Sequence, residues 1–104
     1  MKMKITLLTS VAILVSSCAS TPSPSAATIK EADAKMVEKC QFVGSVFGNS
    51  MLGVAVASTS ASNAITDAKE KASKLGGTHI VVESMKAADL NGGSQTTVRV
   101  YKCQ

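Results

Sequence analysis

The sequence predicts a small α+β domain in which one helix packs on a three-stranded mixed sheet. The expected chain order is strand, helix, strand, strand. Three observations support it: a β-prone run precedes a long amphipathic stretch, two further β-prone runs flank an Asn-Gly turn, and a cysteine stands at the outer end of the first and of the last run. A chain of 104 residues is enough for one such domain.

The first predicted strand covers residues 41–47, QFVGSVF, where phenylalanine and valine are residue types enriched in strands. Gly44 inside this run predicts a bulge or a close approach of another backbone segment. Residues 29–38, before the strand, mix charged residues with alanine and methionine. They are compatible with a short edge strand or with one helical turn.

The predicted helix covers residues 61–75. Its apolar residues recur at steps of three and four, at Ala61, Ile65, Ala68, Ala72 and Leu75. This period predicts an amphipathic helix whose alanines allow it to lie close to a sheet. Ser62 or Asn63 is expected to cap its start, and Gly76-Gly77 to supply its left-handed exit.

The last two predicted strands are residues 79–85, HIVVESM, and 96–103, TTVRVYKC. The segment between them carries Asn91-Gly92-Gly93, which is a strong hairpin signal. The hairpin makes these two strands antiparallel neighbours.

A long uncharged stretch separates Lys39 from Asp67. Its apolar run, residues 51–57, is too short to span a membrane. A mobile loop over the sheet is one interpretation, and a strand or membrane-touching surface is the other. Since so small a core cannot bury the whole stretch, we expect a partner-contact patch at Met51, Leu52, Val54 and Val56.

The N-terminal residues 1–17 are predicted to be a signal peptide. Lys2 and Lys4 precede an apolar core at residues 5–15. This core is too short for a membrane-spanning helix, which needs about 20 residues, but it suits a signal peptide. The junction Val15-Ser16-Ser17-Cys18 resembles the bacterial lipobox, in which lipid is attached to the cysteine sulfur and the chain is cut before it. An ordinary signal peptide with an incidental cysteine is the alternative. Ala19, where Asp would retain the protein at the inner membrane, points to a periplasm-facing protein anchored in the outer membrane.

Residues 18–28 are predicted to be the lipidated cysteine and a flexible tether. This segment has no charge and contains both prolines of the chain. Ten extended residues would reach roughly 30 Å. The folded domain is then expected to cover residues 29–104.

Two cysteines remain once Cys18 is assigned to lipid. Cys40 stands at the start of the first strong strand and Cys103 at the end of the last one, in a chain expected to be exported to a compartment where disulfides persist. A bridge between them implies that these strands are antiparallel neighbours, with the C-terminal strand in the centre of the sheet and a right-handed helical crossover. A reactive or metal-binding thiol pair is the alternative; it has no CxxC spacing, and His79 alone leaves a tetrahedral N/S site short of a ligand.

The charged residues indicate no particular chemistry. Two of the 11 basic residues lie in the predicted signal peptide, so the remaining excess over the 7 acidic residues is only two. With three aromatic residues, this does not favour nucleic-acid binding. His79 begins a predicted strand, and the carboxylates are scattered among lysines. The sequence therefore predicts no catalytic residue, no metal and no cofactor.

Several motifs together resemble a known family. They are Cys40-x-Phe42-Val43-Gly44-x-Val46-x-Gly48, Asn63-(x)4-Ala68-(x)3-Ala72-(x)2-Leu75-Gly76-Gly77, Val81-Val82 and Val100-Tyr101-x-Cys103. They are similar to a family of small outer-membrane lipoproteins catalogued as a domain of unknown function, which distantly resembles the Rcs stress-sensor lipoprotein of enteric bacteria. The resemblance implies a compact α/β domain, a terminal disulfide and an outer-membrane anchor.

The expected function is that of a non-catalytic envelope interaction or stress-monitoring module. Its expected partners are the membrane, through the N-terminal lipid, and an envelope protein. A small-ligand or metal-binding lipoprotein is the alternative, followed by an enzyme or an enzyme inhibitor.

Overall fold

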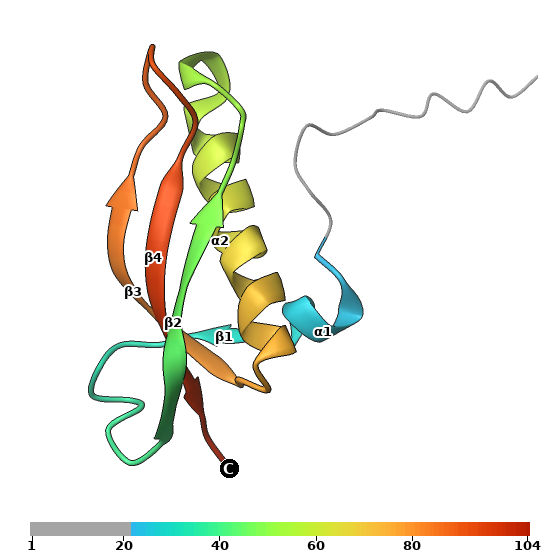
Figure 1. The fold of residues 1–104 in the computed structure, drawn as a ribbon, viewed down its shortest axis with the longest axis vertical. Coiled ribbons are helices and arrows are strands. Elements are labelled where there is room, and N and C mark those ends of the chain that lie inside the picture. Colours follow the sequence, from blue (N-terminus) through green and yellow to red (C-terminus); the bar gives the residue numbers. More distant parts are fainter. Residues whose placement is uncertain (1–21) are drawn as a thin grey trace, which may run out of the picture.

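The computed structural model describes residues 22–104, so the predicted signal peptide, the lipobox and Cys18 lie outside the described residues. A four-stranded mixed sheet carries one long helix, α2, across one face (Figure 1). The elements in chain order are α1 (Pro24–Ala27), β1 (Lys30–Glu31), β2 (Gln41–Asn49), the 3-10 turn η1 (Val54–Val56), α2 (Ala57–Lys74), β3 (His79–Lys86) and β4 (Gln95–Lys102).

The sheet has the strand order β1-β3-β4-β2. The predicted central position of the C-terminal strand is confirmed, because β4 pairs antiparallel with both β2 and β3. The predicted count of three strands is wrong: Lys30 and Glu31 pair in parallel with β3 and form a fourth. This strand has two exposed residues and no apolar pattern. Backbone bonds hold it, from Lys30 N–H to Thr78 O (3.1 Å) and from Ala32 N–H to Ile80 O (2.8 Å).

The helix α2 begins at Ala57, before the predicted start at residue 61, so it is longer than predicted. Ser62 and Asn63 lie inside it and do not cap it; the N-cap residue is Val56, which makes no side-chain capping bond. The predicted exit is confirmed, since Gly76 has φ of 78°.

Small residues set the distance between α2 and the sheet. Ala64, Ala68 and Ala72 are fully buried, with Ile80, Val98 and Val100 of the sheet. A Cβ at Gly48 would collide with the Ala64 carbonyl oxygen, so the helix crosses β2 at its closest there. The buried stripe therefore runs through Ala64, and the predicted core residue Leu75 at the helix end is 46% exposed.

The predicted disulfide is present: Cys40 and Cys103 are bonded, with Cα atoms 4.8 Å apart. Residues 23–28, expected to be part of an extended tether, instead form α1 and its flanks against α2. The alternating serines, prolines and alanines of this segment suit a short capped turn as well as an extended chain.

Candidate functional site

Two loops meet at the end of the sheet away from the C-terminus (Figure 1). One leads from β2 into η1, and the other joins β3 to β4. The Ser50 N–H donates to Ser94 O at 2.9 Å, and Gly93 lies so close to Ser50 that a Cβ would collide with its carbonyl oxygen. The two loops therefore form one continuous surface.

A buried hydroxyl joins this surface to the helix. Ser60 Oγ donates to Leu52 O at 2.7 Å and accepts from the Ser94 N–H at 3.2 Å. Ser60 and Ser94 are both fully buried. One side chain of α2 thus positions both loops.

The exposed apolar side chains on these loops are named here the apolar tip: Met51, Val54, Val56 and Leu90. Met51 is 96% and Leu90 92% exposed, while Val54 is 49% and Val56 37% exposed. Of the four residues predicted as a contact patch, only Leu52 is half-buried and outside the tip. Sequence reasoning missed Leu90, although a large apolar residue directly before Asn91-Gly92 signals exposure at a hairpin corner.

The hairpin corner itself is shaped by Asp89. Asp89 N–H donates to Gly92 O at 2.9 Å, and Asp89 Oδ1 accepts from the Asn91 N–H at 2.8 Å. This second bond, together with the Lys86 ammonium 3.6 Å from Oδ2, holds the pKa of the Asp89 carboxyl below its usual value. Leu90 and Asn91 are therefore the two residues at the turn of the hairpin. The predicted antiparallel hairpin of β3 and β4 is confirmed.

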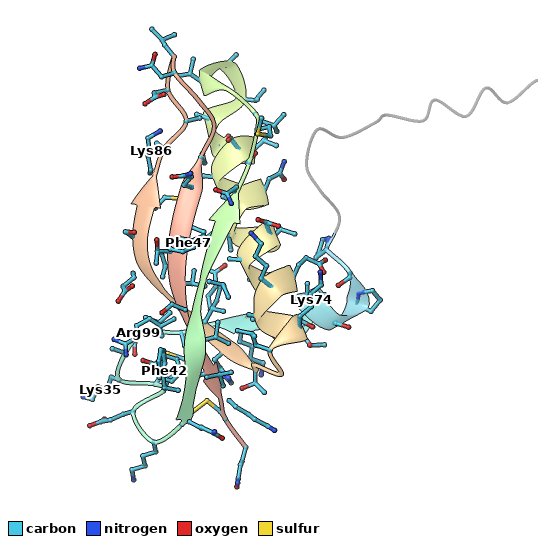
Figure 2. The ribbon with its side chains drawn as sticks, viewed as in Figure 1. Lys35, Phe42, Phe47, Lys74, Lys86 and Arg99 are labelled. Carbon is cyan, nitrogen blue, oxygen red and sulfur yellow. A yellow bond between two sulfur atoms is a disulfide. The ribbon has the colours of Figure 1, made fainter. Side chains whose placement is uncertain are left out.

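The sheet face opposite α2 carries the three aromatic residues of the chain; with Arg99 they are named here the aromatic face: Phe42, Phe47, Arg99 and Tyr101. The Phe42 and Tyr101 rings are 5.5 Å apart, edge to face. The Arg99 guanidinium lies 4.8 Å from the Phe42 ring centre and 5.9 Å from that of Tyr101. Figure 2 shows Arg99 and Phe42 side by side.

A β-bulge creates this face. In a regular strand Phe42 and Phe47 would point to opposite sides, because side chains alternate. The register shift between Phe42 and Gly44 brings both phenylalanines to the same face of the sheet. There Phe42 pairs with Tyr101 of β4, and Phe47 pairs with Thr97. A bulge was one of the two alternatives that the sequence offered at Gly44, and its effect on the direction of the aromatic side chains was not predicted.

The free edge of β2 is partly closed by two side chains of α2. Asp67 Oδ2 accepts from the Asn49 N–H at 2.9 Å, and Lys71 Nζ donates to Phe47 O at 2.6 Å. The two side chains also form an ion pair at 3.0 Å. They satisfy the groups that a further strand would use, so this half of the edge is protected from strand addition.

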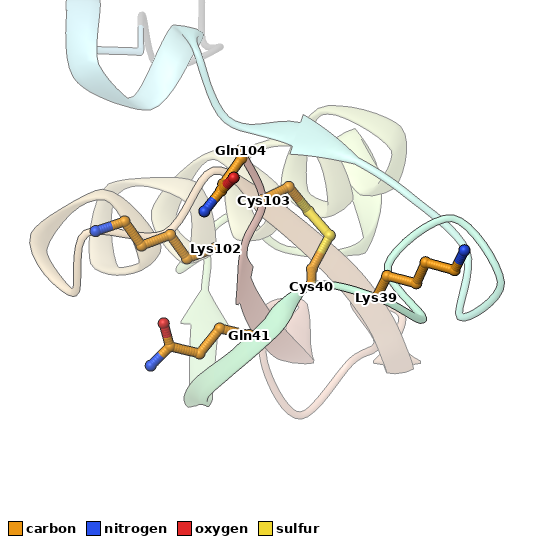
Figure 3. Close-up of a pocket in the computed structure, with 6 residues that line it drawn as sticks. All are labelled: Lys39, Cys40, Gln41, Lys102, Cys103 and Gln104. Carbon is orange, nitrogen blue, oxygen red and sulfur yellow. A yellow bond between two sulfur atoms is a disulfide. The ribbon is translucent and has the colours of Figure 1, made fainter.

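A polar hollow of about 480 Å³ lies beside the disulfide (Figure 3). Its lining residues are Lys39, Cys40, Gln41, Lys102, Cys103 and Gln104. His79, to which the sequence assigned no catalytic or metal-binding role, lies elsewhere, with Nδ1 2.8 Å from Thr78 Oγ1. Within residues 22–104, no group of three or more His, Cys, Asp or Glu side chains is arranged to hold a metal ion. None of the helices in that same part of the chain has the length and apolar character that crossing a membrane requires.

Comparison with known families adds one finding. Residues 20–103 match the model of a domain of unknown function, DUF4156. The chain belongs to this family. No curated protein and no solved structure shows significant similarity to it. The match includes α1, β1 and both cysteines of the bridge.

Proposed function

We propose that this DUF4156 protein is a lipid-anchored outer-membrane lipoprotein whose domain is a non-catalytic interaction module. In this proposal residues 1–17 are removed, Cys18 carries the lipid, and the domain faces the periplasm. There it contacts an envelope protein, as a structural or stress-monitoring partner. The observation that carries the interaction role is the apolar tip.

The apolar tip has the properties of a contact surface. Single exposed apolar residues are common on proteins, but a group contributed by two contacting loops is typical of an interaction site. Met51 and Leu90 extend almost fully into solvent, although both loops are fixed by backbone and serine hydrogen bonds. Since the loops are already ordered, binding loses less conformational entropy than it would on a flexible segment.

The polar hollow beside the disulfide favours a second candidate, a small-ligand lipoprotein. Lys39 and Lys102 at its rim suit a small anion. All four of its non-cysteine side chains are exposed, however, so a ligand there would stay largely in water. The tip is therefore the better-supported site.

The proposed contact is tested by photocrosslinking in living cells. A photoreactive residue at position 90 is compared with one at position 36, because Met36 is also an exposed apolar residue but lies in the loop before β2. We expect a discrete protein adduct from position 90 and none from position 36. The same adducts from both positions, or none from either, would remove the tip from the proposal. Mass spectrometry of the membrane-extracted protein tests the anchor, and an unmodified Cys18 would exclude it.

A further inference from the structure

The N-terminal segment is clamped to α2 by a single serine. The Ser23 N–H donates to Glu70 Oε1 at 2.8 Å, and Ser23 Oγ donates to Oε2 at 3.0 Å. The same hydroxyl accepts from the Ala26 N–H at 3.1 Å and caps α1. Ala26 is fully buried, so a packed side chain supports the two hydrogen bonds to the carboxylate.

This clamp lies on the side of α2 away from the sheet. At 3.6 residues per turn, Glu70 points about 200° away from Ala68 and from Ala72, which face the sheet. Figure 1 shows α1 beside the C-terminal half of α2, on the side opposite to β2, β3 and β4. The order of layers is therefore aromatic face, sheet, α2 and clamp.

The clamp shortens the connection to the proposed lipid. The five residue steps from Cys18 to Ser23 span at most about 18 Å whatever their conformation. Without the clamp, the connection would extend to Ile29, the first buried residue that packs in the core beside Ile80. That longer connection of 11 residue steps spans up to about 40 Å, enough for the domain to turn over.

We propose that the Ser23–Glu70 clamp determines which side of the domain faces the lipid surface: α2 toward the bilayer and the aromatic face away from it. The inference rests on the proposed anchor at Cys18. The short connection leaves from the outer side of α2, so the bilayer lies on that side. The aromatic face, on the opposite side of the sheet, is thereby presented to the periplasm. The apolar tip stands about 20 Å along α2 from the clamp, at the far end of the helix.

The clamp is tested by hydrogen exchange on the lipidated full-length protein. Glu70→Ala removes both acceptors, and Glu38→Ala removes an exposed carboxylate in the loop before β2 as the matched control. We expect the amides of Ala26, Ala27 and Ile29 to exchange about tenfold faster in the Glu70 variant only. Unchanged exchange at these amides would overturn the clamp. Unchanged exchange in β4 shows that the fold is retained.

The orientation is tested by fluorescence quenching in vesicles that contain headgroup spin-labelled lipid. The chain has no tryptophan, so Lys74→Trp on the helix side and Phe47→Trp on the aromatic face each introduce a single probe (Figure 2). We expect quenching to be several-fold stronger at position 74, and Glu70→Ala, but not Glu38→Ala, to abolish the difference.

The outcomes separate the two proposals. Lipidated protein with equal quenching at positions 74 and 47 overturns the orientation and leaves the anchor intact. Protein that carries no lipid on Cys18 overturns the anchor, and the orientation with it.

Discussion

The disulfide end and the apolar tip lie at opposite ends of one sheet, and their strands are held together in different ways. At the disulfide end a covalent bond joins β2 to β4, and Thr78 Oγ1 accepts from the Cys103 N–H at 2.8 Å. At the tip, the links between the loops are hydrogen bonds, several of them through the buried serines Ser60 and Ser94. The end that exposes polar side chains is covalently closed, while the end that exposes apolar side chains depends on packing and hydrogen bonds.

This difference separates stability from contact. The disulfide restricts the conformations open to the unfolded chain, so it stabilises the whole domain without shaping a binding surface. The tip loops present Met51 and Leu90, which make little contribution to the core because they are almost fully exposed. We therefore expect changes at the disulfide end to be global, and those at the tip to be local.

The largest expected effect comes from removing the bridge. Closing a loop with a sequence separation of 63 residues stabilises the fold by about 4 kcal/mol in the chain-entropy model. A Cys40→Ala/Cys103→Ala variant should lose most of its free energy of unfolding, because the core of a domain of this size supplies a net stability of only a few kcal/mol. Urea denaturation measures this. A loss below about 1 kcal/mol would contradict the global stabilising role of the bridge.

The next effect compares two glycines of the same strand. Gly48, toward the tip, has no room for a Cβ beside the Ala64 carbonyl, whereas the nearest atom to a Cβ at Gly44 is Leu75 Cδ1 at 3.7 Å. Gly48→Ala should therefore destabilise the domain by about 1–3 kcal/mol. Gly44→Ala is its matched control and should stay within about 0.5 kcal/mol of the parent. Equal thermal shifts for both would contradict the close approach of α2 at Gly48.

An effect of similar size, but confined to the tip, is expected at Ser60. Ser60→Ala leaves the buried Ser94 N–H without this acceptor and should cost about 1–3 kcal/mol. Hydrogen exchange should accelerate at Ser94 and Leu52 and stay unchanged at Cys103. Ser62→Ala, an exposed change in the same helix, is the control. Uniform acceleration along the chain would mean that the tip does not open separately.

The smallest effect concerns pH at the hairpin corner. Because the pKa of Asp89 is below its ordinary value of 3.8 in the folded state, its contribution is present above that value and is lost as the pH falls through the lowered pKa. The Asn91 amide signal should shift over this acid range in NMR spectra. Asp89→Asn should remove the shift. An Asn91 signal that responds only near neutral pH would contradict this account of the corner.

Much of this fold follows from local patterns in the sequence. The three longer strands, the helix, its glycine exit and the Cys40–Cys103 bridge were predicted, because each has a period, a turn signal or a paired cysteine. The strand β1 was only one of two alternatives for its segment and was not counted in the sheet, because its two residues are exposed and have no apolar pattern. The helix α1 was missed because its docking depends on Glu70, which lies far along the chain.

The candidate surfaces were predicted less completely. Exposure at Met51, Val54 and Val56 followed from an uncharged stretch too long for a small core. Leu90 joins them only because Gly93 packs against Ser50, which is a tertiary contact. The aromatic face depends on the direction in which one bulge turns Phe42, and residue types alone do not determine it.

The central claim is that the apolar tip is the surface through which this domain contacts its envelope partner. The most direct test is a Met51→Asp/Leu90→Asp variant with the photoreactive residue placed at position 54 of the tip. It is compared in living cells with a Met36→Asp variant that carries the same photoreactive residue, by the yield of crosslinked adduct. Because both tip side chains are almost fully exposed, the variant should keep the Cys40–Cys103 bridge and a parent-like melting temperature. The account predicts that the adduct is lost in the tip variant and retained in the Met36 variant. An adduct of parental yield from the correctly folded, disulfide-bonded tip variant would contradict it.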